Sequence, residues 1–318
     1  MYYNKEDFSM YYEKYGNDNK TIVILPGWGE TRTTFYHIIN YFSEKYTIYI
    51  IDFPGFGKSI FPDRDLSIYD YANLIRDFME DEKITNPILL AHSFGGRIAT
   101  LITGYYKDNV EKLILIDSAG IKPKKGILKL LKQTIYKFLK KCSVLVPRKK
   151  RSLYLKRLIY IFGSSDLKKL NKNMYNSFIK VVNEDLKCYY SYISTKTLLI
   201  WGRKDKSTPV RDAKYMKKHI KDSTLFIYPK AGHFSYLEYI EVTNQIIEEF
   251  LENWCSLFLT YVVNIIIVIW FISAITFCIT LIGSWWTFCV TTSVYCLNIS
   301  CLSIISILKS TYTICHNW

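Results

Sequence analysis

The sequence predicts an α/β fold, with a mostly parallel sheet and helices on both of its faces. Two observations lead to this class. Short, continuously apolar runs alternate with longer amphipathic segments over residues 20–252. The short runs show no alternation of polar and apolar residues, which is typical of parallel strands that are buried on both faces. Alternating strands and helices of this kind are the pattern of an α/β architecture.

The predicted elements follow one another from residue 21 onward. The apolar runs predict strands over 21–25, 47–52, 87–91, 112–117, 196–201 and 223–228. Amphipathic periodicity predicts helices over 33–46, 66–82, 95–106, 210–220 and 236–252. The first 20 residues are polar and charged, and they contain no apolar stretch of the kind found in secretory signals.

A basic insertion interrupts the alternation between the fourth and fifth predicted strands. The 318-residue chain has a formal net charge of +14. Residues 121–190 contain 19 lysine and arginine residues against three acidic ones, and the rest of the chain is nearly neutral. This segment is expected to be helical, and it divides the alternating elements into residues 1–120 and 191–253.

The tail, residues 254–318, differs in composition from everything before it. No charged side chain occurs from Asn253 to Leu308. The apolar stretch 255–283 is longer than the roughly 20 residues that a helix needs to cross a bilayer. It therefore predicts a transmembrane segment. A second, more polar crossing over 284–308 is an open alternative. So is the interpretation of the whole tail as a frameshifted read-through.

Several functional classes lack their signatures. None of the eight cysteines has CxxC spacing, so the sequence indicates neither a zinc site nor a disulfide scaffold. It favours a reducing, cytoplasmic setting for the first 250 residues. The stretch "GFGKS" lacks the earlier glycine of a phosphate-binding loop. It also lacks the third glycine of a dinucleotide-binding loop. We therefore expect no metal and no cofactor.

The stretch "AHSFGG", residues 91–96, places Ser93 between a predicted strand and a predicted helix. A serine there is either an ordinary helix N-cap or a nucleophile on a sharp turn crowded by small residues. A nucleophile needs an acid and a histidine later in the chain, and Asp205 and His233 follow strands in that order. The main-chain N–H groups of Phe94 and Trp28 are the candidate oxyanion donors.

These stretches resemble the α/β-hydrolase superfamily, in its cap-bearing branch of small esterases and carbon–carbon bond hydrolases. The matching segments are "LPGWGE", "DFPGFGKS", "AHSFGG", "LILIDSAG", "LLIWGRKD" and "AGHFSYLE". The resemblance implies that Ser93 is the nucleophile, Asp205 the acid and His233 the base. Asp117 is a rival acid, because some relatives take it from the earlier strand. His92 is interpreted as a structural neighbour of Ser93.

The sequence therefore predicts a serine hydrolase that cleaves an ester or related acyl bond of a small, lipophilic substrate and needs only water. The same three residues are compatible with carbon–carbon bond hydrolysis or acyl transfer. A different class also stays open, a non-catalytic binding module with the hydrolase fold, tethered to a membrane. Epoxide hydrolysis and dehalogenation are disfavoured, because relatives with those activities carry aspartate at the position of Ser93.

The insertion and the tail both point to a membrane partner. The resemblance implies that the insertion, residues 121–190, forms a helical cap over the site. It mixes lysine with isoleucine, leucine, tyrosine and phenylalanine at roughly helical spacing. Such an element is typical either of a solvated lid or of a surface attracted to anionic lipid. Nothing beyond charge supports a nucleic-acid partner. We expect a membrane-associated protein whose hydrolase domain faces the cytoplasm, in keeping with the positive-inside trend.

Overall fold

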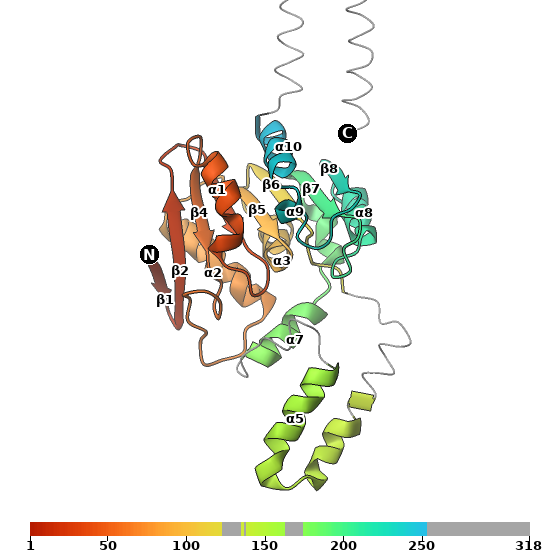
Figure 1. The fold of residues 1–318 in the computed structure, drawn as a ribbon. Coiled ribbons are helices and arrows are strands. Elements are labelled where there is room, and N and C mark those ends of the chain that lie inside the picture. Colours follow the sequence, from red (N-terminus) through yellow and green to blue (C-terminus); the bar gives the residue numbers. More distant parts are fainter. Residues whose placement is uncertain (123–134, 137, 163–173, 253–318) are drawn as a thin grey trace, which may run out of the picture. The chain divides into compact units, whose positions relative to one another are not determined.

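A computed structural model describes residues 1–122, 135–136, 138–162 and 174–252 (Figure 1). By its internal contacts the chain divides into two units, Met1–Asn244 and Gln245–Trp318. The first unit contains the entire sheet, and the described part of the second is the carboxyl-terminal part of helix α10 (Ile240–Glu252).

The strands of the described residues form one eight-stranded sheet in the order β1-β2-β4-β3-β5-β6-β7-β8. Strands β3 to β8 pair in parallel, and β1 and β2 extend one edge in antiparallel pairing. The predicted mostly parallel α/β sheet is thus confirmed. The strands span Tyr2–Lys5 (β1), Phe8–Tyr15 (β2), Thr21–Leu25 (β3), Thr47–Ile51 (β4), Ile88–His92 (β5), Lys112–Ile116 (β6), Lys196–Gly202 (β7) and Ser223–Tyr228 (β8).

Strand β3 lies between β4 and β5, although β4 and β5 follow it in the chain. The order of winding therefore reverses at β3. Loops that leave the carboxyl ends of strands on either side of such a switch point diverge, and the crevice between them is where open α/β sheets bind ligands. The loops after β3 and β5 leave the sheet at this point.

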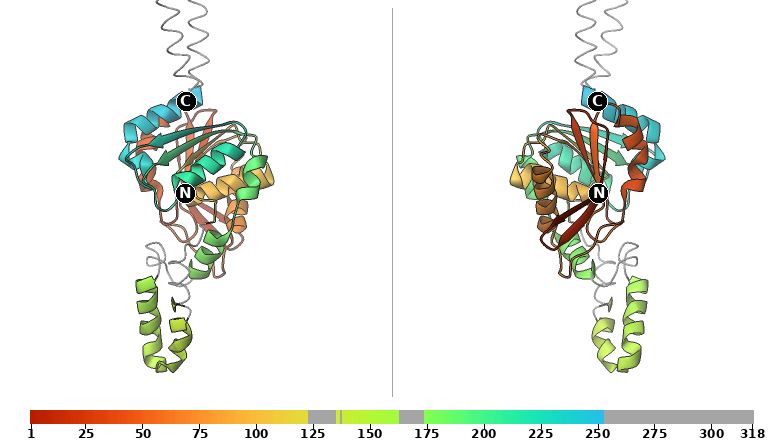
Figure 2. Two further views of the ribbon diagram at one scale, coloured as in Figure 1. Left: turned by 90° about the vertical axis from the view of Figure 1, so that its right-hand side faces the viewer. Right: turned by 90° about the vertical axis from the view of Figure 1, so that its left-hand side faces the viewer.

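Helices lie on both faces of the sheet (Figure 2). In β5, Leu89 and Ala91 join the large apolar cluster to which α2, α3 and α8 contribute, and Leu90 is buried on the opposite face. The continuous apolar strands are thus buried on both sides. The helices of the core span Tyr36–Phe42 (α1), Ile68–Asp81 (α2), Phe94–Thr100 (α3), Val210–His219 (α8) and Ser235–Glu238 (α9), with 3-10 turns at Arg32–Phe35 and Lys187–Tyr192 and a π-helical turn at Leu101–Tyr106.

The amino-terminal hairpin was missed in the sequence analysis. Strand β2 alternates inward side chains (Phe8, Met10 and Tyr12) with half-buried polar ones. An antiparallel strand that is covered on one face shows period-two alternation, and the polar side chains between its apolar positions interrupt the apolar run. The predicted helix over 236–252 is also interrupted, because Tyr239 has a non-helical main chain between α9 and α10.

The described part of the insertion is helical, with α5 at Arg148–Phe162, α7 at Tyr175–Asn183 and a 3-10 turn at Ser143–Leu145. Helix α7 packs against the core, where the Leu66 N–H donates to Ser177 Oγ (2.7 Å). None of the described helices is long and apolar enough to span a membrane. The transmembrane segments predicted over 255–308 lie outside the described residues.

Candidate active site

Ser93 occupies a sharp turn between β5 and α3. Its main chain has a φ of 47° and a ψ of −107°, a conformation that is strained for a residue with a side chain. Gly95 and Gly96 follow it because there is no room for larger residues. A Cβ atom on Gly95 would overlap the carbonyl of Leu25, and one on Gly96 would overlap the side chain of Ser118. The Ser93 side chain is therefore presented at the strand end and does not cap the helix.

Loops from two other strands bring His233 and Asp205 to Ser93. The Nε2 atom of His233 lies 2.9 Å from Ser93 Oγ. Its Nδ1 atom lies 2.7 Å from Asp205 Oδ2. Asp205 follows β7 and His233 follows β8, so the parallel sheet places both loops at the same edge as Ser93. A carboxylate only accepts hydrogen bonds, so Nδ1 carries the proton and Nε2 is free to accept one from the serine hydroxyl.

Asp205 is surrounded by hydrogen-bond donors. Its Oδ1 accepts from the main-chain N–H groups of Ser207 (2.7 Å) and Thr208 (3.0 Å), and its Oδ2 accepts from Thr208 Oγ1 (2.6 Å). Burial alone raises the pKa of this carboxyl, but the hydrogen bond and charge of His233 and the bonds from Thr208 outweigh it and lower the pKa. Asp205 is therefore ionised at neutral pH. Thr208 was not singled out from the sequence.

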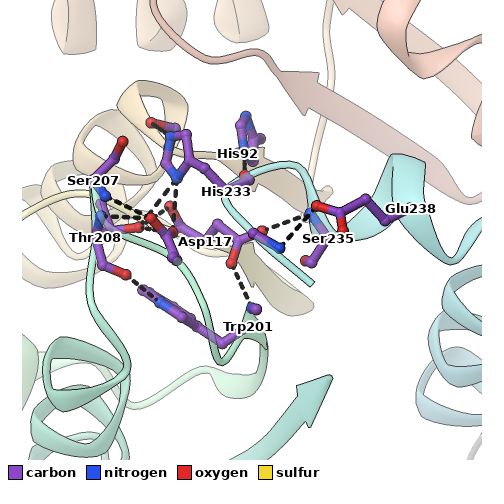
Figure 3. Close-up of polar contacts among 12 residues, drawn as sticks. His92, Asp117, Trp201, Ser207, Thr208, His233, Ser235 and Glu238 are labelled. Carbon is purple, nitrogen blue, oxygen red and sulfur yellow. Dashed lines mark hydrogen bonds and ion pairs between the residues drawn. The ribbon is translucent and has the colours of Figure 1, made fainter. Parts of the chain in front are cut away.

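Asp117, the rival acid, binds main-chain N–H groups and not His233 (Figure 3). Its Oδ1 accepts from the Gly202 N–H (2.8 Å) and its Oδ2 from the Ser235 N–H (3.0 Å). Burial raises its pKa to about 6, and the charge of His92 and these hydrogen bonds oppose the rise. Asp117 thereby connects the main chain before Asp205 with the main chain after His233.

The loop after β3, hereafter the 26–30 loop, lies beside the serine turn. The Gly95 N–H donates to the carbonyl of Pro26 (3.0 Å), and the rings of Trp28 and Phe94 meet edge to face with centroids 5.0 Å apart. Among the contacts of the described residues, neither the Trp28 nor the Phe94 main-chain N–H donates a hydrogen bond. Both predicted oxyanion donors are thus in the neighbourhood of Ser93.

The surroundings of Trp28 are aromatic. Its ring centroid lies 5.0 Å from that of Phe56 and 5.2 Å from that of Phe178, which belongs to α7 of the insertion. Tyr71 of α2 packs on Phe94 with a centroid distance of 5.1 Å. Apolar rings from the core and from the insertion therefore gather next to the candidate oxyanion donors.

Two further features complete the site. His92 forms a buried ion pair with Glu30, which the sequence analysis did not single out. The only signal for Glu30 was its place in "LPGWGE", directly after the glycine-rich turn. Within the described residues no group of histidine, cysteine, aspartate or glutamate side chains is arranged to hold a metal ion.

Comparison with known proteins gives a consistent result. The family model described as alpha/beta hydrolase fold matches residues 20–181 and 160–239. A pimeloyl-[acyl-carrier protein] methyl ester esterase from Wigglesworthia glossinidia brevipalpis is 27% identical over 258 residues, which are 75% of this chain and 96% of the relative. A 2-hydroxy-6-oxononadienedioate/2-hydroxy-6-oxononatrienedioate hydrolase from Escherichia coli K12 is 25% identical over 261 residues, which are 75% of this chain and 89% of the relative.

The solved structures agree on the fold. An esterase from Exiguobacterium antarcticum superposes with a TM-score of 0.61 at 24% identity, covering 77% of this chain and 96% of the esterase. At this identity the likeness bears on the fold and not on the reaction.

Proposed function

The chain belongs to the alpha/beta hydrolase fold family, and on that premise we propose that it is a serine hydrolase that cleaves an ester or related acyl bond. The observation that carries the proposal is the unbroken line of contacts from Ser93 Oγ through His233 to Asp205, with distances of 2.9 and 2.7 Å. A serine is a weak nucleophile until a base within hydrogen-bond distance takes its proton, and that base needs a third group to orient it.

In the proposed reaction, Ser93 Oγ attacks the acyl carbon while His233 Nε2 takes the hydroxyl proton. The Trp28 and Phe94 N–H groups bind the oxyanion of the tetrahedral intermediate. His233 then gives its proton to the leaving alkoxide, which departs as an alcohol and leaves an acyl group on Ser93. A water molecule attacks this ester with His233 as base, and the acid product and free Ser93 result. Asp205 stays ionised and stabilises the imidazolium in both halves.

The rings around Trp28 support a lipophilic acyl substrate. Phe56, Phe94 and Phe178 pack on Trp28 and make the surroundings of the 26–30 loop apolar. An apolar acyl group gains about 25 cal/mol for each Å² that it removes from water, whereas a charged group at the same rings loses its hydration without a partner.

Carbon–carbon bond hydrolysis is a second candidate, because the relative from Escherichia coli K12 is named for such a reaction. Both candidates use the same nucleophile, and substrate preference separates them. We expect the purified protein to hydrolyse p-nitrophenyl esters faster than a diketone. The reverse preference would replace the esterase proposal with the second candidate.

The deciding experiment treats the full-length protein with a fluorophosphonate probe beside Ser93→Ala. Labelling of the parent alone is the expected result, because the probe reacts with activated serines. Both proteins are also treated with the probe in the presence of anionic vesicles, because a cap that closes over Ser93 in solution would block labelling until it meets a membrane. A folded parent that takes no label under either condition contradicts the enzyme proposal and favours a non-catalytic binding module.

We also propose that the protein acts at a cytoplasmic membrane surface, and the described part of the insertion supports this. Lys149, Leu153 and Arg157 share one face of α5 at four-residue spacing and are exposed, with Leu153 at 61%. Phe138 (65%) and Val144 (72%) are exposed as well, and no acidic residue occurs between them and α5. Apolar side chains among cations match a bilayer that contains anionic lipid.

Vesicle sedimentation tests this second proposal. The predicted tail is expected to bind any bilayer regardless of its charge. The difference in bound protein between phosphatidylserine-containing and pure phosphatidylcholine vesicles therefore reports on the basic insertion. We expect tighter binding to the anionic vesicles, and Leu153→Glu should reduce the difference. Lys214→Gln, on the exposed side of α8, is the matched control, because it lowers the net charge by one, as Leu153→Glu does, but away from the insertion. Equal binding of the parent to both vesicles contradicts the proposal.

A further inference from the structure

A buried ion pair lies directly behind the candidate triad. His92 is the last residue of β5 and precedes Ser93, and its side chain is fully buried. Its Nδ1 atom lies 2.7 Å from Oε1 of Glu30, whose side chain is 9% exposed. Glu30 ends the 26–30 loop, which carries the candidate oxyanion donor Trp28.

The second nitrogen of His92 reaches the loop of the catalytic base. His92 Nε2 lies 2.9 Å from the main-chain oxygen of His233. A carbonyl oxygen only accepts, so Nε2 carries a hydrogen. Because Nδ1 lies 2.7 Å from a carboxylate oxygen, which also only accepts, we assign the ring as an imidazolium, protonated on both nitrogens. Because both nitrogens are engaged and buried, His92 is not placed to act as a second base for Ser93.

The second oxygen of Glu30 closes the arrangement. Glu30 Oε2 accepts from the Gly27 N–H (2.9 Å), and the Tyr236 hydroxyl lies 3.4 Å from the same atom. The pair therefore joins three segments that are far apart in the sequence: the 26–30 loop, the end of β5, and the chain around His233. Each of these segments carries one group of the proposed reaction.

The electrostatics of the pair are consistent with this geometry. Burial opposes the charge on His92, but Glu30 outweighs it, and with a contribution from Asp117 it raises the pKa of His92 to about 9. Burial likewise opposes the charge on Glu30, but His92, the Gly27 N–H and His233 lower its pKa. Removing one member leaves the other as an uncompensated buried charge, so the two act as a unit.

We propose that His92 and Glu30 are positioning residues, which hold the main chain of His233 and the 26–30 loop in register with Ser93 without touching the reacting atoms. The inference rests on the proposed serine-hydrolase function. Its physical basis is that a misplacement of about 1 Å in a catalytic group lowers the rate by as much as about 100-fold, and these contacts fix the placement of two such groups.

The test uses the full-length protein and a p-nitrophenyl acyl ester. Glu30→Ala removes the ion pair and the acceptor for Gly27. We expect kcat to fall by about 10- to 100-fold while KM changes by less than about threefold, since the displaced groups stabilise the transition state more than the bound substrate. Tyr12→Phe is the matched control, because it removes a buried hydroxyl that donates to Glu82 (2.9 Å) outside the site. It should leave kcat unchanged.

Glu30→Gln removes the charge of Glu30 but keeps a side chain of the same shape, so this variant is expected to fold and tests the charge alone. The glutamine oxygen can accept from Gly27, and its amide can donate to a neutral His92. We expect this variant to retain at least half of the parent's kcat near pH 7. The parent's kcat should decline as pH rises through about 9, because deprotonated His92 turns a lone pair toward Glu30. The groups that face His92 are Glu30, Asp117, His233 and Tyr236, and only the first is changed.

In Glu30→Gln, this alkaline decline should be absent, a result that loss of stability alone does not produce. The double variant Glu30→Ala/His92→Ala should lose no more kcat than the worse single variant. The inference is overturned if folded Glu30→Ala keeps kcat within twofold of the parent, or if the alkaline decline persists in Glu30→Gln. The failure of the proposed function looks different, because the parent itself then shows no turnover that Ser93→Ala abolishes.

Discussion

The guanidinium of Arg97 donates a hydrogen bond to the main-chain carbonyl of Glu184 over 2.9 Å. Arg97 belongs to α3, the helix that begins directly after Ser93, and only 4% of the residue is exposed. Glu184 lies where the insertion returns to the core, and the nearby Leu186 N–H donates to the carbonyl of Gly120 (2.9 Å). This buried hydrogen bond thus connects the carboxyl-terminal end of the insertion, at Glu184, to helix α3, which follows the candidate nucleophile.

Arg97→Ala is expected to lower the free energy of unfolding by about 2–4 kcal/mol, because it leaves the Glu184 carbonyl without its donor and opens a cavity in the core. Urea denaturation followed by circular dichroism measures the change. Lys214→Ala, on the exposed side of α8, serves as the control and should stay within about 0.5 kcal/mol of the parent. An Arg97→Ala variant as stable as the control would show that the contact is dispensable.

The strained turn at Ser93 leads to a second prediction. Both Ser93→Ala and Ser93→Gly abolish the proposed activity, but only glycine adopts a positive φ without steric cost. We expect the free energy of unfolding of Ser93→Gly to exceed that of Ser93→Ala by about 1 kcal/mol, so that the glycine variant is the more stable one. The pair Lys214→Gly and Lys214→Ala should show the opposite order, because glycine destabilises an ordinary helical position. The same order at both sites would argue against strain at Ser93.

The two buried aspartates allow a matched comparison of activity. Asp205→Asn replaces the acceptor of the His233 Nδ1 proton with an amide, which favours the wrong tautomer of His233. We expect kcat to fall by about 10³- to 10⁴-fold. Asp117→Asn removes a charge of similar burial that binds only main-chain N–H groups, and it should reduce kcat by less than about tenfold. Steady-state ester hydrolysis measures both, and a larger loss in Asp117→Asn would reassign the acid.

Stability should depend on pH through the His92–Glu30 pair. The pKa of His92 is raised to about 9 in the folded protein, against about 6.5 in an unfolded chain. A raised pKa contributes stability that is complete below pH 6.5 and is lost as pH rises through 9. The difference between the folded and unfolded pKa values of His92 corresponds to about 3 kcal/mol in the free energy of unfolding.

The measurement compares urea unfolding of the parent and of Glu30→Gln between pH 6.5 and 9.5. Other groups that titrate in this range are common to both proteins, so the difference between the two curves reports the pair. The parent's advantage should shrink toward the alkaline end. Parallel curves over the whole window would mean that His92 is neutral in the folded state.

Much of the fold follows from local sequence patterns. Continuous apolar runs predicted six of the strands, because a parallel strand buried on both faces needs apolar residues at every position. Strands β1 and β2 escaped detection, because covering on one face leaves exposed or half-buried, mostly polar side chains between the buried positions and breaks the apolar run. Likewise, Gly95 and Gly96 marked the sharp turn, but the main-chain carbonyl that excludes a side chain at Gly95 comes from Leu25, a residue 70 positions earlier.

Sequence patterns alone predicted the α/β class, the order of the strands from residue 21 onward, and the candidates Ser93, Asp205 and His233. These features depend on residue type, spacing and position after a strand. Only the tertiary structure shows which of Asp117 and Asp205 faces His233, because both follow strands and the contact depends on how the loops after them fold. It alone paired His92 with Glu30, since a contact between residues 62 positions apart depends on which strands are neighbours in the sheet.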